Sequence, residues 1–188
     1  MITVIIGKTC SGKDTIVKKL ISLHGFGRVV THTSRPKRKG EVDGKDYHFI
    51  DKFDFKQKIE EGFFAEWKSY VTVDGVWYYG TALEDLEHTE GNNVIILTPD
   101  DYREMKDKLG DNVTSIYIYA NNSTIKKRLI ARGDDKDEAK RRLEHDNEDF
   151  KGIENEVDRI VYNNDGTDID DVVAKILEIV EGKNELCR

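Results

Sequence analysis

The chain has 188 residues, of which 37% are hydrophobic and 36% charged, a balance that suits one globular domain and excludes disordered and collagen-like architectures. Its formal net charge of −7 argues against a protein that coats nucleic acid through bulk positive charge, so any anionic ligand must be held by local groups. The cysteines Cys10 and Cys187 match neither a disulfide framework nor a zinc spacing, and no stretch approaches the roughly 20 apolar residues of a membrane helix. We therefore expect a cytoplasmic protein.

The first element is a β-branched apolar run over residues 2–6 that ends at Gly7, which is typical of a parallel strand buried on both faces. Apolar residues then recur at helical spacing from Ile16 to Leu23, which predicts a helix. Further strands are expected at residues 28–33, 94–97, 113–119 and 159–162, with helical patterns after several of them. This order predicts an α/β fold with a mostly parallel core sheet flanked by helices.

The pattern changes between Tyr47 and Thr81, where aromatic segments suited to antiparallel strands occur at residues 63–67, 70–73 and 76–79. The pair Asp74-Gly75 is typical of a hairpin turn. We expect a small β-rich subdomain inserted into the α/β core.

The stretch from residue 122 to 150 is dense in charge and is interrupted at Gly133, which predicts two solvated helices joined by a loop. The tail carries apolar residues at helical spacing, with Asp168 or Asp170 available as the N-terminal cap. No internal repeat or linker is visible, so one domain spanning residues 1–188 is the best partition.

Residues 7–13 match the phosphate-loop pattern GxxxxGK, directly after the buried strand and before a helix. The glycines let backbone N–H groups converge on a phosphate, and Lys13 adds a full positive charge, so a polyphosphate site is predicted. Asp14 stands where the pattern usually has Ser or Thr and is followed by Thr15. Its carboxylate could accept from water on a hydrated Mg²⁺ or repel the phosphates, and the sequence leaves both open. Cys10, inside the loop, is interpreted as a small filler residue.

A second group of motifs follows, containing Ser34-Arg35-Pro36, then GEVDG at residues 40–44 and DYHF at residues 46–49. In this order after a phosphate loop, these motifs resemble those of the guanylate kinase family. The resemblance continues through residues 61–67, 77–81, 128–133, 142–143 and 161–165, and so covers nearly the whole chain. It implies a P-loop kinase fold with a core of about residues 1–33, 82–121 and 152–188, a monophosphate-binding subdomain of about residues 34–81, and a helical lid of about residues 122–151.

The resemblance also implies a transferase of purine nucleotide metabolism that passes the γ-phosphoryl group of ATP to GMP, and to dGMP, with release of ADP. Mg²⁺ is the expected cofactor, bridging the donor phosphates. ATP and GMP are the expected partners, no nucleic acid or membrane is expected, and the chain is expected to be a monomer or a homodimer.

Site residues follow from the same resemblance. Two guanidinium groups three residues apart, Arg35 and Arg38, suit bidentate binding of a monophosphate, and one carboxylate, Glu66, can accept from both the N1–H and the amino group of guanine. The implied GMP-binding residues are Thr31, Arg35, Arg38, Tyr47, Glu66, Tyr79 and Thr81. The implied ATP-binding residues are Gly7, Ser11, Gly12, Lys13, Asp14, Thr15 and Asn163, with Asn164 as a rival to Asn163. The implied catalytic residues are Lys13, Arg128, Arg132 and Arg142, with Arg141 as a rival to Arg142.

The chain departs from the family pattern at residues 93–102, where the family usually has LDIDxQG. Leu97 and Pro99 occupy the expected aspartate places, and Asp100 or Asp101 is displaced by one or two residues. The sequence therefore does not decide whether Asp14 or Thr15 binds the metal, and Asp100 is a further candidate. Two alternatives stay open as well: a nucleoside monophosphate kinase with an altered acceptor base, and a non-catalytic binding module of guanylate kinase type.

Overall fold

The computed structural model describes residues 1–72, 75–87, 91–109, 113–133 and 136–186 of the chain. Its larger sheet has five parallel strands in the order β2-β7-β1-β8-β9. These strands are β2 (Gly27–Arg28), β7 (Asn93–Ile96), β1 (Ile2–Ile6), β8 (Val113–Tyr119) and β9 (Arg159–Tyr162). The predicted α/β fold with a parallel core sheet is thereby confirmed.

The central strand β1 shows why this sheet is buried on both faces. All five of its residues are buried, and its side chains alternate between two apolar clusters. Val4 and Ile6 share one cluster with Tyr102 of α4 (Pro99–Leu109), whereas Ile5 shares the other with residues of α1 (Lys13–His24) and α7 (Ile169–Leu186). Helices therefore cover both faces, as expected for a strand without polar alternation.

The smaller sheet has the order β4-β3-β6-β5 and contains β4 (His48–Phe49), β3 (His32–Thr33), β6 (Gly75–Ala82) and β5 (Phe64–Thr72). β5 and β6 form the predicted antiparallel hairpin, with Glu66 opposite Thr81 and Thr72 opposite Gly75. The segments predicted separately at residues 63–67 and 70–73 belong to one continuous strand up to Thr72. Asp74, the first residue of the predicted turn, lies outside the described residues, and Gly75 is already part of β6.

The strand predicted at residues 28–33 is wrong as one element. Its ends belong to β2 and β3, which pair with β7 of the parallel sheet and with β6 of the smaller sheet respectively. Residues 29–31 cross between the two sheets, so the smaller sheet begins before residue 34. The apolar pattern could not reveal this crossing because both ends are extended backbone.

Two short helices accompany the smaller sheet, α2 (Lys52–Glu60) and α3 (Leu83–Glu87). Helix α2 was not predicted from the sequence. Its start is nevertheless encoded locally, since the Asp51 carboxylate accepts from the backbone N–H groups of Phe53 and Asp54 at 2.8 and 2.9 Å.

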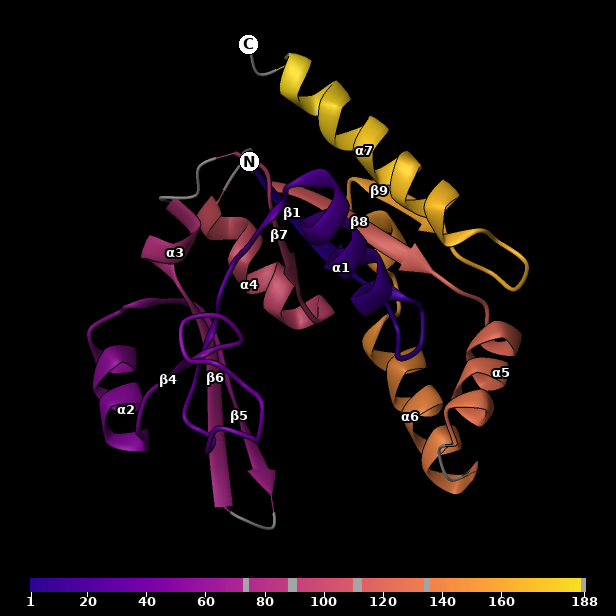
Figure 1. The fold of residues 1–188 in the computed structure, drawn as a ribbon. Helices are drawn as coiled ribbons and strands as arrows, with labels where there is room; N and C mark the ends of the chain where they lie inside the picture. The colour runs from indigo at the N-terminus through magenta and orange to yellow at the C-terminus, as the bar shows by residue number, and fades with distance from the viewer. Residues whose placement is uncertain (73–74, 88–90, 110–112, 134–135, 187–188) are drawn as a thin grey trace.

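The charged stretch forms α5 (Asn122–Arg132) and α6 (Lys136–Asp149), and the predicted break at Gly133 is confirmed by a left-handed φ of 86°. At the tail, the Asp168 carboxylate accepts from the N–H of Asp170, so Asp168 is the cap of α7. A short helix, η2 (Ile153–Asn155), precedes β9. No helix among the described residues has the length and apolar character needed to cross a bilayer. In Figure 1 the loop from β1 to α1 lies between the smaller sheet at lower left and the α5–α6 pair at lower right.

Candidate functional site

The loop between β1 and α1 is wound around the Lys13 side chain. The Lys13 ammonium donates to the carbonyls of Gly7 and Lys8 at 2.5 and 2.9 Å, and burial lowers the pKa of Lys13. Gly12 has a left-handed φ of 100°, and a Cβ there would lie 2.3 Å from Nδ2 of Asn163. Only glycine therefore fits at this position.

A cavity of about 400 Å³ opens beside this loop, and we call it the donor cavity. Two predicted residues from other elements reach the loop there: Asn163 Nδ2 donates to the Ser11 carbonyl at 2.7 Å, and Arg128 Nη1 donates to the Cys10 carbonyl at 3.2 Å. The residues lining the donor cavity are Cys10, Gly12, Lys13, Asp14, Thr15, Arg128, Arg132, Asn163, Thr167 and Ile169. The structure thus brings seven predicted residues together. Asn163 lines the cavity, whereas Asn164 accepts from the Asn121 N–H instead.

The contact between this loop and α6 was not predicted from the sequence. The Thr9 N–H donates to Asp146 Oδ2 at 2.6 Å, and the Lys8 ammonium donates to Asn147 Oδ1 at 2.6 Å. A carboxylate of the chain itself therefore occupies one backbone donor of the phosphate loop. No local pattern could have indicated this contact, because its partners lie 137 positions apart in the sequence.

A second cavity of about 260 Å³, which we call the acceptor cavity, lies against the smaller sheet. Its residues are Thr31, Tyr47, Glu66, Lys68, Tyr70, Tyr79, Gly80, Ile96, Leu97 and Asp101. Thr31, Tyr47, Glu66 and Tyr79 were predicted, whereas Lys68, Tyr70 and Asp101 were not assigned to GMP. Lys68 and Tyr70 could have been found, since residues two and four positions after Glu66 lie on the same face of a strand.

Glu66 is the most deeply placed carboxylate of the acceptor cavity, with 7% of the residue exposed. The Thr81 hydroxyl donates to Glu66 Oε1 at 2.5 Å. Burial, with a contribution from Asp101, raises the pKa of Glu66 to about 7. Nearby, the Lys68 ammonium pairs with Asp101 at 2.8 Å. The cavity therefore presents a carboxylate whose neutral form is favoured by its burial.

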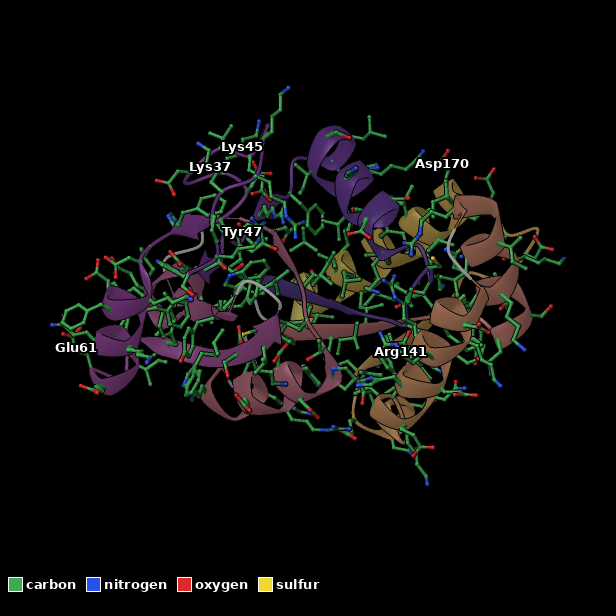
Figure 2. The ribbon with its side chains drawn as sticks, turned by 90° about the horizontal axis from the view of Figure 1, so that it is seen from below. Lys37, Lys45, Tyr47, Glu61, Arg141 and Asp170 are labelled. Atoms are coloured by element: carbon green, nitrogen blue, oxygen red, sulfur yellow. The ribbon has the colours of Figure 1, made fainter. Side chains whose placement is uncertain are left out.

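Arg35 and Arg38 lie outside the lining of both cavities. Arg35 is 5% exposed, and its guanidinium donates two hydrogen bonds to the Glu41 carboxylate at 2.7 and 2.5 Å. These bonds hold the pKa of Glu41 at about 2. The guanidinium carbon also lies 5.1 Å from the centre of the Tyr47 ring, whereas the Arg38 side chain is exposed. Figure 2 shows Tyr47 toward the middle of the molecule, with Lys37 and Lys45 of the same loop at its periphery.

Asp100 and Arg142 also lie outside both linings. Asp100 pairs with Arg103 at 2.8 Å, and its neighbour Asp101 faces the acceptor cavity instead. Arg142 is a half-buried residue of α6. A third cavity of about 310 Å³ shares Asp14 with the donor cavity and both Thr31 and Tyr47 with the acceptor cavity, so it adjoins both sites.

The residues at the start of α1 fit a hard divalent cation. Asp14 and Thr15 line the donor cavity next to Lys13 and offer a carboxylate and a hydroxyl oxygen. Mg²⁺ prefers such oxygen ligands and usually keeps part of its water shell, so exposed side chains suit it.

Comparison with known proteins agrees with this arrangement. The family model described as guanylate kinase matches residues 1–183. A guanylate kinase from Wolinella succinogenes is 34% identical over 170 residues, covering 87% of this chain and 77% of the relative. A guanylate kinase from Sulfurimonas denitrificans is 33% identical over 187 residues, covering 95% of this chain and 85% of the relative. A crystal structure of guanylate kinase from Anaplasma phagocytophilum shares the fold, with a TM-score of 0.67 at 23% identity over 97% of this chain and 85% of that one. From its motifs, its fold and these relatives, the chain belongs to the guanylate kinase family.

Proposed function

We propose that the protein transfers the γ-phosphoryl group of ATP to GMP, and to dGMP, yielding ADP and the diphosphate. The observation that carries this proposal is the pair of cavities that adjoin a common third one, the first built on a phosphate loop and the second around a buried carboxylate. A kinase must hold two nucleotides in one arrangement, and its catalysis is mostly positioning and electrostatic stabilisation.

The donor cavity suits the triphosphate of ATP. The Lys13 ammonium already lies inside the loop, where it donates to the Gly7 and Lys8 carbonyls. A phosphate bound in the loop would lie close to this ammonium, and burial strengthens the attraction between the two charges. Arg132 lines the same cavity and can offset charge on the moving phosphoryl group, while Arg128 holds the loop through the Cys10 carbonyl. Mg²⁺, held by Asp14 or Thr15, would neutralise charge on the donor phosphates.

The acceptor cavity suits guanine because of Glu66. Guanine presents N1–H and an amino group side by side, and one ionised carboxylate can accept from both. The Thr81 hydroxyl orients that carboxylate, and Tyr47 and Tyr79, which line the same cavity, can add hydroxyl donors. Adenine lacks the donor pair, so Glu66 favours guanine over adenine.

The monophosphate is the natural ligand of Arg38 and Arg35. The exposed Arg38 can meet it directly, whereas Arg35 is held by Glu41 and must share or exchange that partner. The Arg35 guanidinium carbon lies 5.1 Å from the centre of the Tyr47 ring, and Tyr47 lines the acceptor cavity, which supports a role for Arg35 beside that cavity. A phosphate dianion is a better partner for two guanidinium groups than one carboxylate is.

The reaction places the protein in purine nucleotide metabolism, in the compartment that holds ATP and GMP, which we take to be the cytoplasm. The absence of a nucleic-acid partner and a monomeric or homodimeric state remain predictions from the sequence.

The test is an ADP-release assay with ATP and Mg²⁺ across AMP, GMP, dGMP, IMP, CMP and UMP. We expect the highest kcat/KM with GMP and dGMP, and loss of turnover in Lys13→Ala protein whose fold is checked by circular dichroism. Preference for another base would show that the changed segment around Leu97 and Asp101 has altered the acceptor. Tight GMP binding without turnover of any acceptor would identify a binding module instead.

A further inference from the structure

The face of the smaller sheet opposite the acceptor cavity carries a cluster of two imidazoles and one carboxylate. His32 and His48 are direct neighbours on β3 and β4, with ring centres 4.6 Å apart, and Asp85 comes from α3. One potential ligand atom from each residue lies within 4.8 Å of the others. Among the described residues, this is the one group of at least three histidine, cysteine, aspartate or glutamate side chains whose ligand atoms lie this close together.

The cluster is partly buried, with His32 buried and both His48 and Asp85 half-buried, and two of its polar atoms lack partners in the described part of the chain. His32 is 8% exposed, and both its Nδ1 atom and Oδ2 of Asp85 are buried without a hydrogen-bond partner in the described part of the chain. These two atoms face each other at 3.6 Å, which is too long for a hydrogen bond. Leaving two buried polar atoms unpaired costs free energy, which favours a ligand that bridges them.

The surroundings favour a neutral, metal-binding imidazole over an ion pair. Burial, together with the nearby His48 and Lys58, lowers the pKa of His32 to about 4, so its pairing with Asp85 is not a salt bridge at neutral pH. The rings of Phe63 and Phe64 pack roughly perpendicular to the His32 ring, with ring centres 5.3 and 5.7 Å away. Apolar walls of this kind exclude water and leave the nitrogen lone pair for a cation.

We propose that His32, His48 and Asp85 form a binding site for a late first-row transition metal, with Zn²⁺ as the natural probe. Two imidazoles and a carboxylate are a donor set that suits zinc and not the hard cation Mg²⁺. Ligand atoms around tetrahedral zinc lie about 3.3 Å apart when the metal–ligand bonds are about 2.0–2.1 Å. Separations of up to 4.8 Å must therefore shorten by up to about 1.5 Å, which rotation of side chains can supply.

A metal here would join β3, β4 and α3, and so two segments that also line the acceptor cavity. Thr31 and Tyr47, which face that cavity, each directly precede one of the two histidines. The site is separate from the phosphate chemistry, and the proposal does not depend on the proposed kinase function.

The test is calorimetric titration of the metal-free full chain with ZnCl₂, without nucleotide, together with thermal melts. We expect one Zn²⁺ per chain, a higher Tm with zinc, and no displacement by excess Mg²⁺. Asp85→Asn, which keeps the side-chain shape, and His48→Ala should each weaken binding by more than about a hundredfold, beyond the loss that a supporting partner causes.

Two matched variants complete the experiment. His24→Gln removes an exposed histidine of α1 and should bind zinc as the wild type does. Cys10→Ser should also leave binding intact, because Cys10 lies in the phosphate loop. The proposal would be overturned by unchanged zinc affinity in folded Asp85→Asn and His48→Ala protein, by loss of binding in Cys10→Ser, or by displacement with Mg²⁺.

Discussion

Replacing Glu66 by Gln tests the buried carboxylate of the acceptor cavity through stability as well as catalysis. Burial raises the pKa of Glu66 to about 7 from an ordinary value of 4.5. Glutamine is neutral at every pH, has nearly the same shape, and can still accept from the Thr81 hydroxyl. The variant therefore isolates the effect of charging this one group inside the folded protein.

The sign and size of the effect come from proton linkage. Because the folded-state pKa is the higher one, the stabilisation is fully present below about pH 4.5 and is lost as the pH rises through about 7. A shift of about 2.5 units corresponds to roughly 3 kcal/mol in total, of which about 2.5 kcal/mol falls between pH 5 and pH 8.5. Glu66→Gln should thus gain about 2.5 kcal/mol relative to the wild type over that range.

Urea unfolding at pH 5, 7 and 8.5 measures this gain from the transition midpoint and slope. Glu60→Gln is the matched control, since Glu60 is an exposed residue of α2 and should show no such pH-dependent difference. A pH-independent difference for Glu66→Gln, equal to that of the control, would refute the claim that a buried carboxylate titrates near neutral pH.

The same variant tests base selection. The substituted amide presents N–H donors to the donor pair of guanine, so kcat/KM for GMP should fall by roughly tenfold to a hundredfold in Glu66→Gln. IMP lacks the amino group and should lose less. In the wild type, acceptor binding should improve as the pH rises through about 7 and Glu66 ionises. An unchanged ratio of GMP to IMP kinetics would remove Glu66 from base recognition and direct attention to Asp101.

Four further outcomes are expected. Lys13→Ala should lower kcat by at least about a hundredfold, as loss of one buried charge-stabilising donor does, and near-normal turnover by a folded variant would exclude the loop from catalysis. Arg38→Ala should raise the KM for GMP by roughly tenfold while leaving that for ATP unchanged; equal effects on both, seen by calorimetry, would place this arginine elsewhere. Asp146→Asn should lower the KM for ATP, by a change that corresponds to about 1 kcal/mol or less in binding free energy, because the Asp146 carboxylate competes with phosphate for the Thr9 N–H. An unchanged or higher KM for ATP in steady-state kinetics would contradict this. Gly80→Ala should cost about 1–3 kcal/mol in urea unfolding, since a Cβ there would lie 2.9 Å from a phenylalanine ring and 3.0 Å from a backbone carbonyl, and wild-type stability would show that these neighbours yield.

Local patterns were sufficient for most elements and for the phosphate loop. A strand of five β-branched residues, a glycine-rich turn and a helical repeat specify β1 and α1 because each depends on neighbours within a few residues. Gly133 interrupts the charged helices for the same reason, since its left-handed φ is a property of one residue. The alternation of side chains along a strand also indicates that Glu66, Lys68 and Tyr70 share one face, although only Glu66 was predicted as a site residue.

Only the tertiary structure decided how separate segments meet. Residues 28–33 look like one strand, yet their ends pair in different sheets, because pairing depends on partners far along the chain. The contact of Thr9 with Asp146 and the meeting of His32 with Asp85 also join segments that no local pattern relates. The degree to which each side chain is buried follows from such long-range contacts, and burial is what raises the pKa of Glu66. A sequence pattern specifies which backbone conformation is favourable, whereas burial and charge environment are properties of the whole packed chain.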